Sequence, residues 1–175
     1  MLSSIRWKGS KMELERKFKW CLEKGKKAGR KHRGIRKVKL DKSEAQNHIA
    51  KAIHNLKAVE YNLKGDFEDW AVSAAFYAMY HSLLAILRAL GYESRNQECS
   101  INAVEYFIKT KKIDFDAKYI AMIRRAEELR GGNAKTLREE FQYGTEVEVD
   151  KEILESLRAN SKEFVEAAQV LIEKI

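Results

Sequence analysis

The chain has 175 residues, 45% of them hydrophobic and 34% charged, a balance typical of a soluble globular protein with one sizeable core. We find no apolar stretch of the roughly 20 residues that span a bilayer, and the first residues lack the apolar centre of a secretory signal, so we expect a cytoplasmic protein without a membrane segment. The formal net charge of +8 is uneven, because residues 1–40 carry a net +12 and residues 41–175 a net −4. We therefore divide the chain into a basic N-terminal arm, residues 1–40, and a second domain, residues 41–175.

The arm begins with a predicted amphipathic helix over residues 11–24. Its apolar positions Leu14, Phe18, Cys21 and Leu22 follow the spacing i, i+4, i+7, i+8. Residues 25–40 come next and contain three glycines and nine basic residues, with His32 counted. Like charges and glycine disfavour a helix, so we expect a linker that is ordered only on a partner or on the domain.

The basic linker is a candidate nucleic-acid contact, since clustered cations bind phosphates without sequence preference. We expect no base stacking here, because no aromatic residue lies among the cations. Docking on the acidic domain or on an acidic partner protein, or plain solvation, are the alternatives. The candidate contact residues are Lys26, Lys27, Arg30, Lys31, Arg33, Arg36 and Lys37.

The second domain is predicted to be all helical. Asp41 and Glu44 form a capping box, and an amphipathic pattern continues from there to about Lys64. Residues 68–90 are apolar nearly all round and predict a central helix, which Gly91 ends. Further helices are expected over about residues 100–110, 116–130 and 150–175, with a short helical piece over 136–143, whereas residues 145–149 have no partner strand and predict no sheet. The fold class is therefore all-α, a four- to five-helix up-and-down bundle with a basic N-terminal helical arm.

The cysteine and histidine spacings predict no metal site and no cofactor. Cys21 and Cys99 form no CxxC pair, so we expect buried or free thiols and neither a zinc site nor a disulfide framework. His48 and His54 are six residues apart, which places them on different faces of one helix and not in a zinc-binding pair.

Residues 70–91, WAVSAAFYAMYHSLLAILRALG, resemble the second helix of HEPN domains (higher eukaryotes and prokaryotes nucleotide-binding), most clearly in the core FYAMYH. Downstream, Arg138 and Tyr143 in LREEFQYG resemble the Arg…Tyr element before that family's last helix. The resemblance covers about residues 41–175 and leaves the basic arm outside. It implies a helical bundle that commonly forms a homodimer. Many members are metal-independent endoribonucleases of toxin–antitoxin and related defence systems, and others are partners of minimal nucleotidyltransferases.

The catalytic motif of the family is Arg-x4–6-His, and only its first half is matched here. Arg95 and Asn96 fit the start, but the positions that would hold the histidine are Ser100, Ile101 and Asn102. Cleavage of RNA without metal needs an imidazole as acid and base, which these side chains cannot replace. His81 lies fourteen residues before Arg95 and is expected to be a packing or network residue.

Two interpretations of the Arg95 turn stay open. In the first, Asn96 or Ser94 caps the next helix, Glu98 favours its N-terminus, and Arg95 pairs with Glu98 or another acid. In the second, Arg95 and Asn96 bind phosphate or a base on a dimer surface, with Glu98, His81, Arg138 and Tyr143 in support.

We therefore expect a dimeric nucleotide- or RNA-binding component of a toxin–antitoxin or minimal-nucleotidyltransferase-associated system that lacks the intact Arg-x4–6-His motif. The alternatives are a divergent metal-independent endoribonuclease that uses Arg95 and a non-catalytic protein–protein assembly module.

Overall fold

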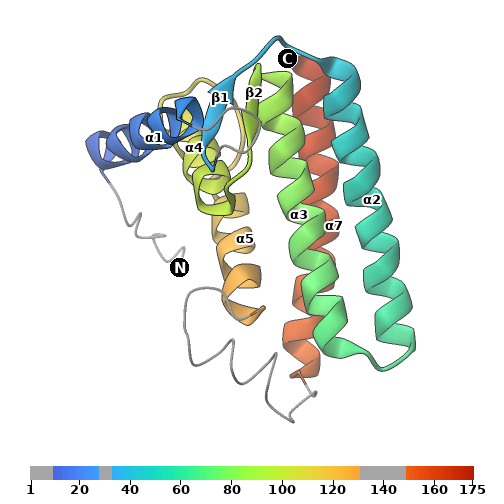
Figure 1. Ribbon diagram of the computed structural model, residues 1–175. Coiled ribbons are helices and arrows are strands. Elements are labelled where there is room, and N and C mark those ends of the chain that lie inside the picture. The colour runs from blue at the N-terminus through green and yellow to red at the C-terminus, as the bar shows by residue number, and fades with distance from the viewer. Residues whose placement is uncertain (1–9, 28–32, 131–148) are drawn as a thin grey trace.

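The computed structural model describes residues 10–27, 33–130 and 149–175. In these ranges the chain forms an all-α bundle of six helices with one small pair of strands (Figure 1). The helices are α1 (Lys11–Lys26), α2 (Lys42–Lys64), α3 (Glu68–Ala89), α4 (Gln97–Lys109), α5 (Lys118–Leu129) and α7 (Lys151–Lys174). The strands are β1 (Ile35–Lys37) and β2 (Tyr92–Ser94). The short helical piece predicted over residues 136–143 lies outside the described residues.

Helix α3 is the centre of the bundle, as its apolar sequence predicted. It packs against α2 and α7 on one side and against α4 and α5 on the other. By length and composition α3 could cross a membrane, which corrects the expectation that no segment is apolar enough. However, 67% of its most apolar 18-residue stretch is buried inside the protein. A buried helix of this kind is typical of the core of a soluble bundle.

The ends of the long helices are capped by aspartate side chains and by glycine. Asp41 Oδ1 accepts a hydrogen bond from Glu44 N at 2.9 Å, which confirms the predicted N-terminus of α2. At the start of α7, Asp150 Oδ1 accepts a hydrogen bond from Glu152 N at 2.9 Å. Gly91 follows α3 with φ of +77°, a left-handed conformation that glycine adopts without steric cost.

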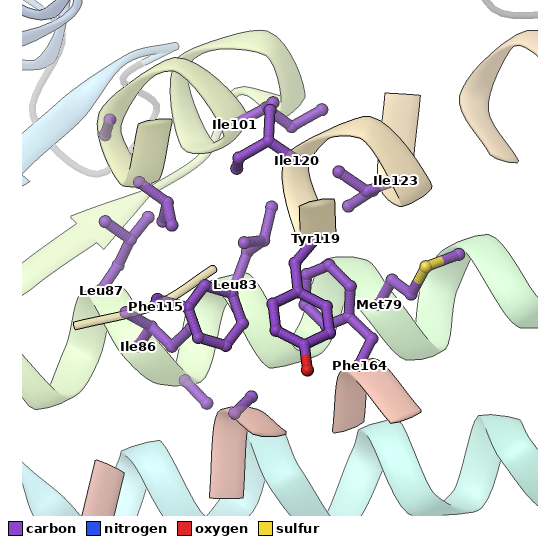
Figure 2. Packing of buried hydrophobic residues seen from close by; sticks show 14 of the residues in the cluster. Met79, Leu83, Ile86, Leu87, Ile101, Phe115, Tyr119, Ile120, Ile123 and Phe164 are labelled. Atoms are coloured by element: carbon purple, nitrogen blue, oxygen red, sulfur yellow. The ribbon is translucent and has the colours of Figure 1, made fainter. Parts of the chain in front are cut away.

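The core draws on all six described helices, and in one part of it apolar side chains of α3, α4, α5 and α7 meet (Figure 2). Three aromatic rings pack together at its edge, between α5 and α7: Phe115, Tyr119 and Phe164 have centroid separations between 4.5 and 5.7 Å. Because rings at these separations stack or meet edge to face, they fix how α5 packs on α7.

Helix α1 packs on α4, and a disulfide between Cys21 and Cys99 joins the two helices. Cys21 lies on the buried stripe of α1 with Leu14 and Phe18, and Cys99 lies in the first turn of α4. The expectation of free thiols was therefore wrong.

The two strands attach the second half of the basic arm to the domain. β1 pairs antiparallel with β2, with Ile35 opposite Ser94 and Lys37 opposite Tyr92. No strand was predicted here, because each strand is only three residues long. The described part of the arm, residues 10–27 and 33–40, therefore lies on the domain, which was one of the alternatives for it; we call it the docked basic segment.

Two glycines of the arm allow this close packing. A Cβ added to Gly25 would lie 1.9 Å from the carbonyl oxygen of Ile35, and one added to Gly34 would lie 2.3 Å from that of Cys21. From the sequence, both glycines indicate a flexible linker. In the structure they are the two positions where the backbone of α1 packs directly against the chain around β1, and only glycine leaves room for this contact.

Candidate functional site

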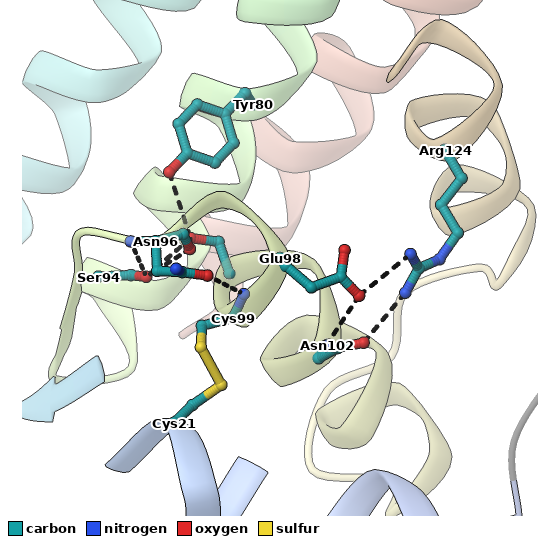
Figure 3. Close-up of a disulfide and its surroundings, with 9 residues drawn as sticks. Cys21, Tyr80, Ser94, Asn96, Glu98, Cys99, Asn102 and Arg124 are labelled. Atoms are coloured by element: carbon teal, nitrogen blue, oxygen red, sulfur yellow. Dashed lines mark hydrogen bonds and ion pairs between the residues drawn. A yellow bond between two sulfur atoms is a disulfide. The ribbon is translucent and has the colours of Figure 1, made fainter. Parts of the chain in front are cut away.

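The turn between β2 and α4 is held by hydrogen bonds around Asn96. Its Oδ1 accepts a hydrogen bond from Cys99 N at 2.9 Å, and the Ser94 hydroxyl donates to its carbonyl oxygen at 3.2 Å (Figure 3). The predicted capping role of Asn96 is thus confirmed. A phosphate contact by Asn96 stays a prediction and would use the amide Nδ2, because only that group of the side chain can donate to an anion.

The carboxylate of Glu93 on β2 lies between two guanidinium groups. Its Oε2 accepts a hydrogen bond from Arg36 Nη2 at 2.8 Å, and its Oε1 accepts one from Arg95 Nε at 3.0 Å. The hydrogen bond from Arg36 is the main reason why the pKa of the Glu93 carboxyl is lowered. The trio keeps a net charge of +1, and 49% of the Arg95 side chain is exposed.

This carboxylate brings together two predicted site residues from different parts of the chain. Arg36 belongs to the docked basic segment and Arg95 to the turn, and the backbone N–H of Arg95 also donates to the Gly34 carbonyl at 3.0 Å. The ion pair of Arg95 is with Glu93 and not with Glu98. The basic segment and the Arg95 turn therefore form one continuous surface.

The positions at which the resemblance expects a histidine face the interior. Ser100 and Ile101 are fully buried, and Asn102 is 4% exposed. Ser100 Oγ lies 2.8 Å from the Asn96 carbonyl oxygen and 3.4 Å from Tyr80 Oη. Burial raises the pKa of the Tyr80 phenol, so this tyrosine stays neutral near pH 7. These contacts hold the turn in place and supply no base.

Glu98 belongs to a network between α4 and α5 that was not predicted. Arg124 Nη2 donates to Asn102 Oδ1 at 3.0 Å, and Arg124 Nη1 lies 3.5 Å from Glu98 Oε1 (Figure 3). Arg124 Nη2 also donates to Glu105 Oε2 at 3.0 Å. The only sequence signal for it is the i, i+4 spacing of Glu98 and Asn102. Glu98 is thus bound to a structural cation and supports the turn indirectly.

A second polar cluster lies next to the central helix. Gln97 Nε2 donates to Glu127 Oε1 at 2.5 Å, and Arg130 Nη2 donates to Gln97 Oε1 at 3.1 Å. The guanidinium of Arg130 lies 4.0 Å from the ring centroid of Phe76. Burial raises the pKa of the Glu127 carboxyl. The cluster ties the start of α4 to the end of α5, and no feature of the sequence indicated it.

His81 contacts a second histidine, His48 of α2, and not the Arg95 turn. The two Nδ1 atoms are 3.1 Å apart, so one ring donates to the other. Burial, and then the neighbouring His48, lower the pKa of His81 to about 4, and burial also lowers the pKa of His48. Both rings are neutral near pH 7. His81 is therefore a network histidine, as expected, while its partner was missed because 33 residues separate the two.

The docked basic segment carries eleven Lys and Arg and three Glu, a net charge of +8. Of the predicted contact residues, Lys27, Arg33 and Lys37 are exposed, Lys26 pairs with Glu23 at 2.5 Å, and Arg36 is bound to Glu93. Arg30, Lys31, Arg138 and Tyr143 lie outside the described residues.

The rest of the described chain offers less for an anionic ligand. A cavity of about 350 Å³ between α5 and α7 is lined by four carboxylates and one cation, Lys174, so its net negative charge disfavours phosphate. Its acidic lining residues are Asp114, Asp116, Glu163 and Glu166. Within residues 10–27, 33–130 and 149–175, no group of three or more His, Cys, Asp or Glu is placed to hold a metal ion.

In a comparison with protein-family models, the model of the HEPN domain matches residues 45–171. The match covers α2 to α7 and begins after the docked basic segment. A search of curated proteins found no match.

Proposed function

Since the chain belongs to the HEPN domain family, we propose that it is a nucleotide- or RNA-binding component of a toxin–antitoxin or minimal-nucleotidyltransferase-associated system. The observation that supports this most is the position of Glu93 between Arg36 and Arg95, because it joins the docked basic segment to the turn at which the family begins its motif. The docked basic segment, with a net charge of +8, lies next to that turn and attracts a phosphate backbone.

We propose binding without cleavage. No histidine follows any arginine with four to six residues between them. Ser100, at the matching position, is buried, and its hydroxyl donates a hydrogen bond to the Asn96 carbonyl oxygen of the same turn. The four histidines are His32, His48, His54 and His81, and the structure pairs His48 with His81. A site with cations and no acid–base group near pH 7 can hold RNA but has no route for its proton transfers.

We also propose a homodimer in which α3 contributes to the contact between protomers. Three large side chains on or beside this helix are exposed to solvent: Phe67 by 53%, Trp70 by 64% and Tyr77 by 43%. Exposed apolar residues grouped in this way are typical of a surface that a partner covers. Light scattering on the purified protein should give twice the chain mass, and Trp70→Glu should give the single chain mass; a wild-type monomer would contradict the proposal.

The binding proposal is tested with a short, labelled single-stranded RNA in fluorescence anisotropy at several salt concentrations. The variant Lys37→Ala/Arg95→Ala removes two cations of the surface and keeps the Arg36–Glu93 pair. If each cation contacts one phosphate, the slope of log K against log salt should fall by about 1.4, since each phosphate contact on a single strand contributes about 0.7. The control Lys57→Ala/Lys64→Ala removes two exposed cations from α2 and should leave the slope unchanged.

The outcomes separate the three functions. Wild-type binding with a reduced slope only in Lys37→Ala/Arg95→Ala supports the proposal, and equal losses in both double variants would contradict it. Metal-free cleavage that Arg95→Ala abolishes would favour the endoribonuclease. A protein that neither binds nor cleaves RNA would favour the protein–protein assembly module.

A further inference from the structure

The outward face of α1 carries a row of one aromatic and three basic side chains. Arg16, Trp20, Lys24 and Lys27 follow each other at spacings of four, four and three residues, which places them on one side of a helix. The opposite side holds the buried Leu14 and is turned to the bundle. Trp20 is 55% exposed, so it does not serve the core.

The carboxylates of α1 form their ion pairs with lysines outside this row, and only Glu23 also attracts a member of it, Lys27, electrostatically. The three glutamates of α1 bind other lysines, in the pairs Glu13–Lys17, Glu15–Lys19 and Glu23–Lys26. Over the described parts of the chain, Arg16, Lys24 and Lys27 make no ion pair with a carboxylate. The row therefore offers three cations around one indole ring.

Lys24 links this row to the Arg95 turn. Its Nζ lies 3.8 Å from the centroid of the Trp20 ring. Its Cβ would be 2.8 Å from a Cβ added to Gly34, and the Gly34 carbonyl accepts the hydrogen bond from Arg95 N at 3.0 Å. The buried Gly34 thus contacts both α1 at Lys24 and the turn before α4, so the row and the turn are neighbours in the fold.

We propose that Arg16, Trp20, Lys24 and Lys27 form a binding site for single-stranded nucleic acid, in which a base stacks on the face of the Trp20 ring that Lys24 does not cover and phosphates contact the three cations. The inference rests on the proposed function and adds the class of ligand. A stacking ring with cations along a backbone path is the common means of binding a single strand without sequence preference. It also changes the sequence-based interpretation that no aromatic residue accompanies the cations, because α1 places Trp20 among them.

Two features of α1 favour a single strand over other anionic surfaces. The bases of a duplex are already stacked on each other, so their faces are not available to a ring on a helix surface. A lipid surface would require the apolar side of α1, and that side is buried against α4 with Leu14, Phe18 and Cys21.

The test compares Trp20→Ala and Trp20→Phe with the control Tyr61→Ala, which removes an aromatic side chain that is 75% exposed on α2. The probes are a labelled oligouridylate, an RNA duplex of the same length and vesicles containing phosphatidylserine. Trp20→Ala should weaken oligouridylate binding about 5- to 150-fold, the range for one base–aromatic stack. Trp20→Phe should keep most of the affinity, and Tyr61→Ala should keep all of it.

Each outcome supports or overturns the inference. Loss of single-strand binding in Trp20→Ala with unchanged duplex binding supports it. Wild-type binding that Trp20→Ala leaves unchanged overturns it and spares the proposed function, whereas no binding of RNA by the wild type overturns both. Vesicle binding that depends on Trp20, without single-strand binding, would overturn it in favour of a membrane surface. Circular dichroism of all variants confirms that each one folds.

Discussion

Removing the bridge between α1 and α4 tests how the docked basic segment is held. In the variant Cys21→Ala/Cys99→Ala, the unfolded chain regains the freedom of a loop closed over 78 residues. The chain-entropy relation gives a stabilisation of about 4.5 kcal/mol for a loop of this length, within the usual range of about 2–5 kcal/mol for a native disulfide. A loss of that size is a large part of the about 5–15 kcal/mol that stabilises a typical domain.

The assay is urea unfolding of the air-oxidised protein, followed by circular dichroism, with and without dithiothreitol. We expect the variant and the reduced wild type to unfold at similar, lower urea concentrations, and dithiothreitol to leave the variant unchanged. The variant should still fold, because Leu14 and Phe18 keep α1 in the core and β1 keeps its pairing with β2. A loss below about 1 kcal/mol, or alkylation of both cysteines in denatured protein before reduction, would refute the reasoning.

Three further predictions concern stability and protonation. Asn96→Ala should cost about 1 kcal/mol in urea unfolding through loss of the α4 cap, while Asn96→Asp should cost little. Gly25→Ala should cost more than Asn96→Ala, because its new Cβ would lie 1.9 Å from the Ile35 carbonyl oxygen. His81 should titrate in NMR with a pKa of about 4. Because this folded-state pKa is below the unfolded one of about 6.5, the stability from neutral His81 is complete above pH 6.5 and lost as the pH falls towards 4.

Local signals predicted the helices of the domain well. The caps at Asp41 and Asn96 and the glycine after α3 each act within a few residues, so the sequence shows them directly. The central position of α3 followed from its lack of a polar face. Apolar periodicity places the start of α4 at Ser100, three residues after the observed start at Gln97, because the first turn behind the Asn96 cap is polar.

Contacts between distant residues could not be predicted in the same way. The disulfide joins positions 78 residues apart, and β1 pairs with β2 although α2 and α3 lie between them in the sequence. A three-residue strand has no periodicity of its own, and a cysteine 78 residues from the next one shows no motif. Gly25 and Gly34 were ambiguous for a physical reason, since glycine serves both flexible segments and close backbone contacts.

The candidate site was predicted in part. Arg95 and Asn96 were found from the resemblance, and the structure adds that Glu93 joins Arg95 to Arg36. The sequence showed the basic run but could not show which surface it lies on. Trp20 precedes that run in the sequence, and only the fold of α1 turns it outward beside Lys24.

The most direct measurement of the central claim is an NMR titration of the isotope-labelled protein with a short single-stranded RNA. If the docked basic segment and the Arg95 turn form one binding surface, the amides of α1, β1 and residues 94–97 should shift together, with the indole N–H of Trp20, and with a common dissociation constant. Resonances of α7 should stay in place. Shifts confined to α2 and α7, or separate affinities for α1 and for the Arg95 turn, would contradict the account.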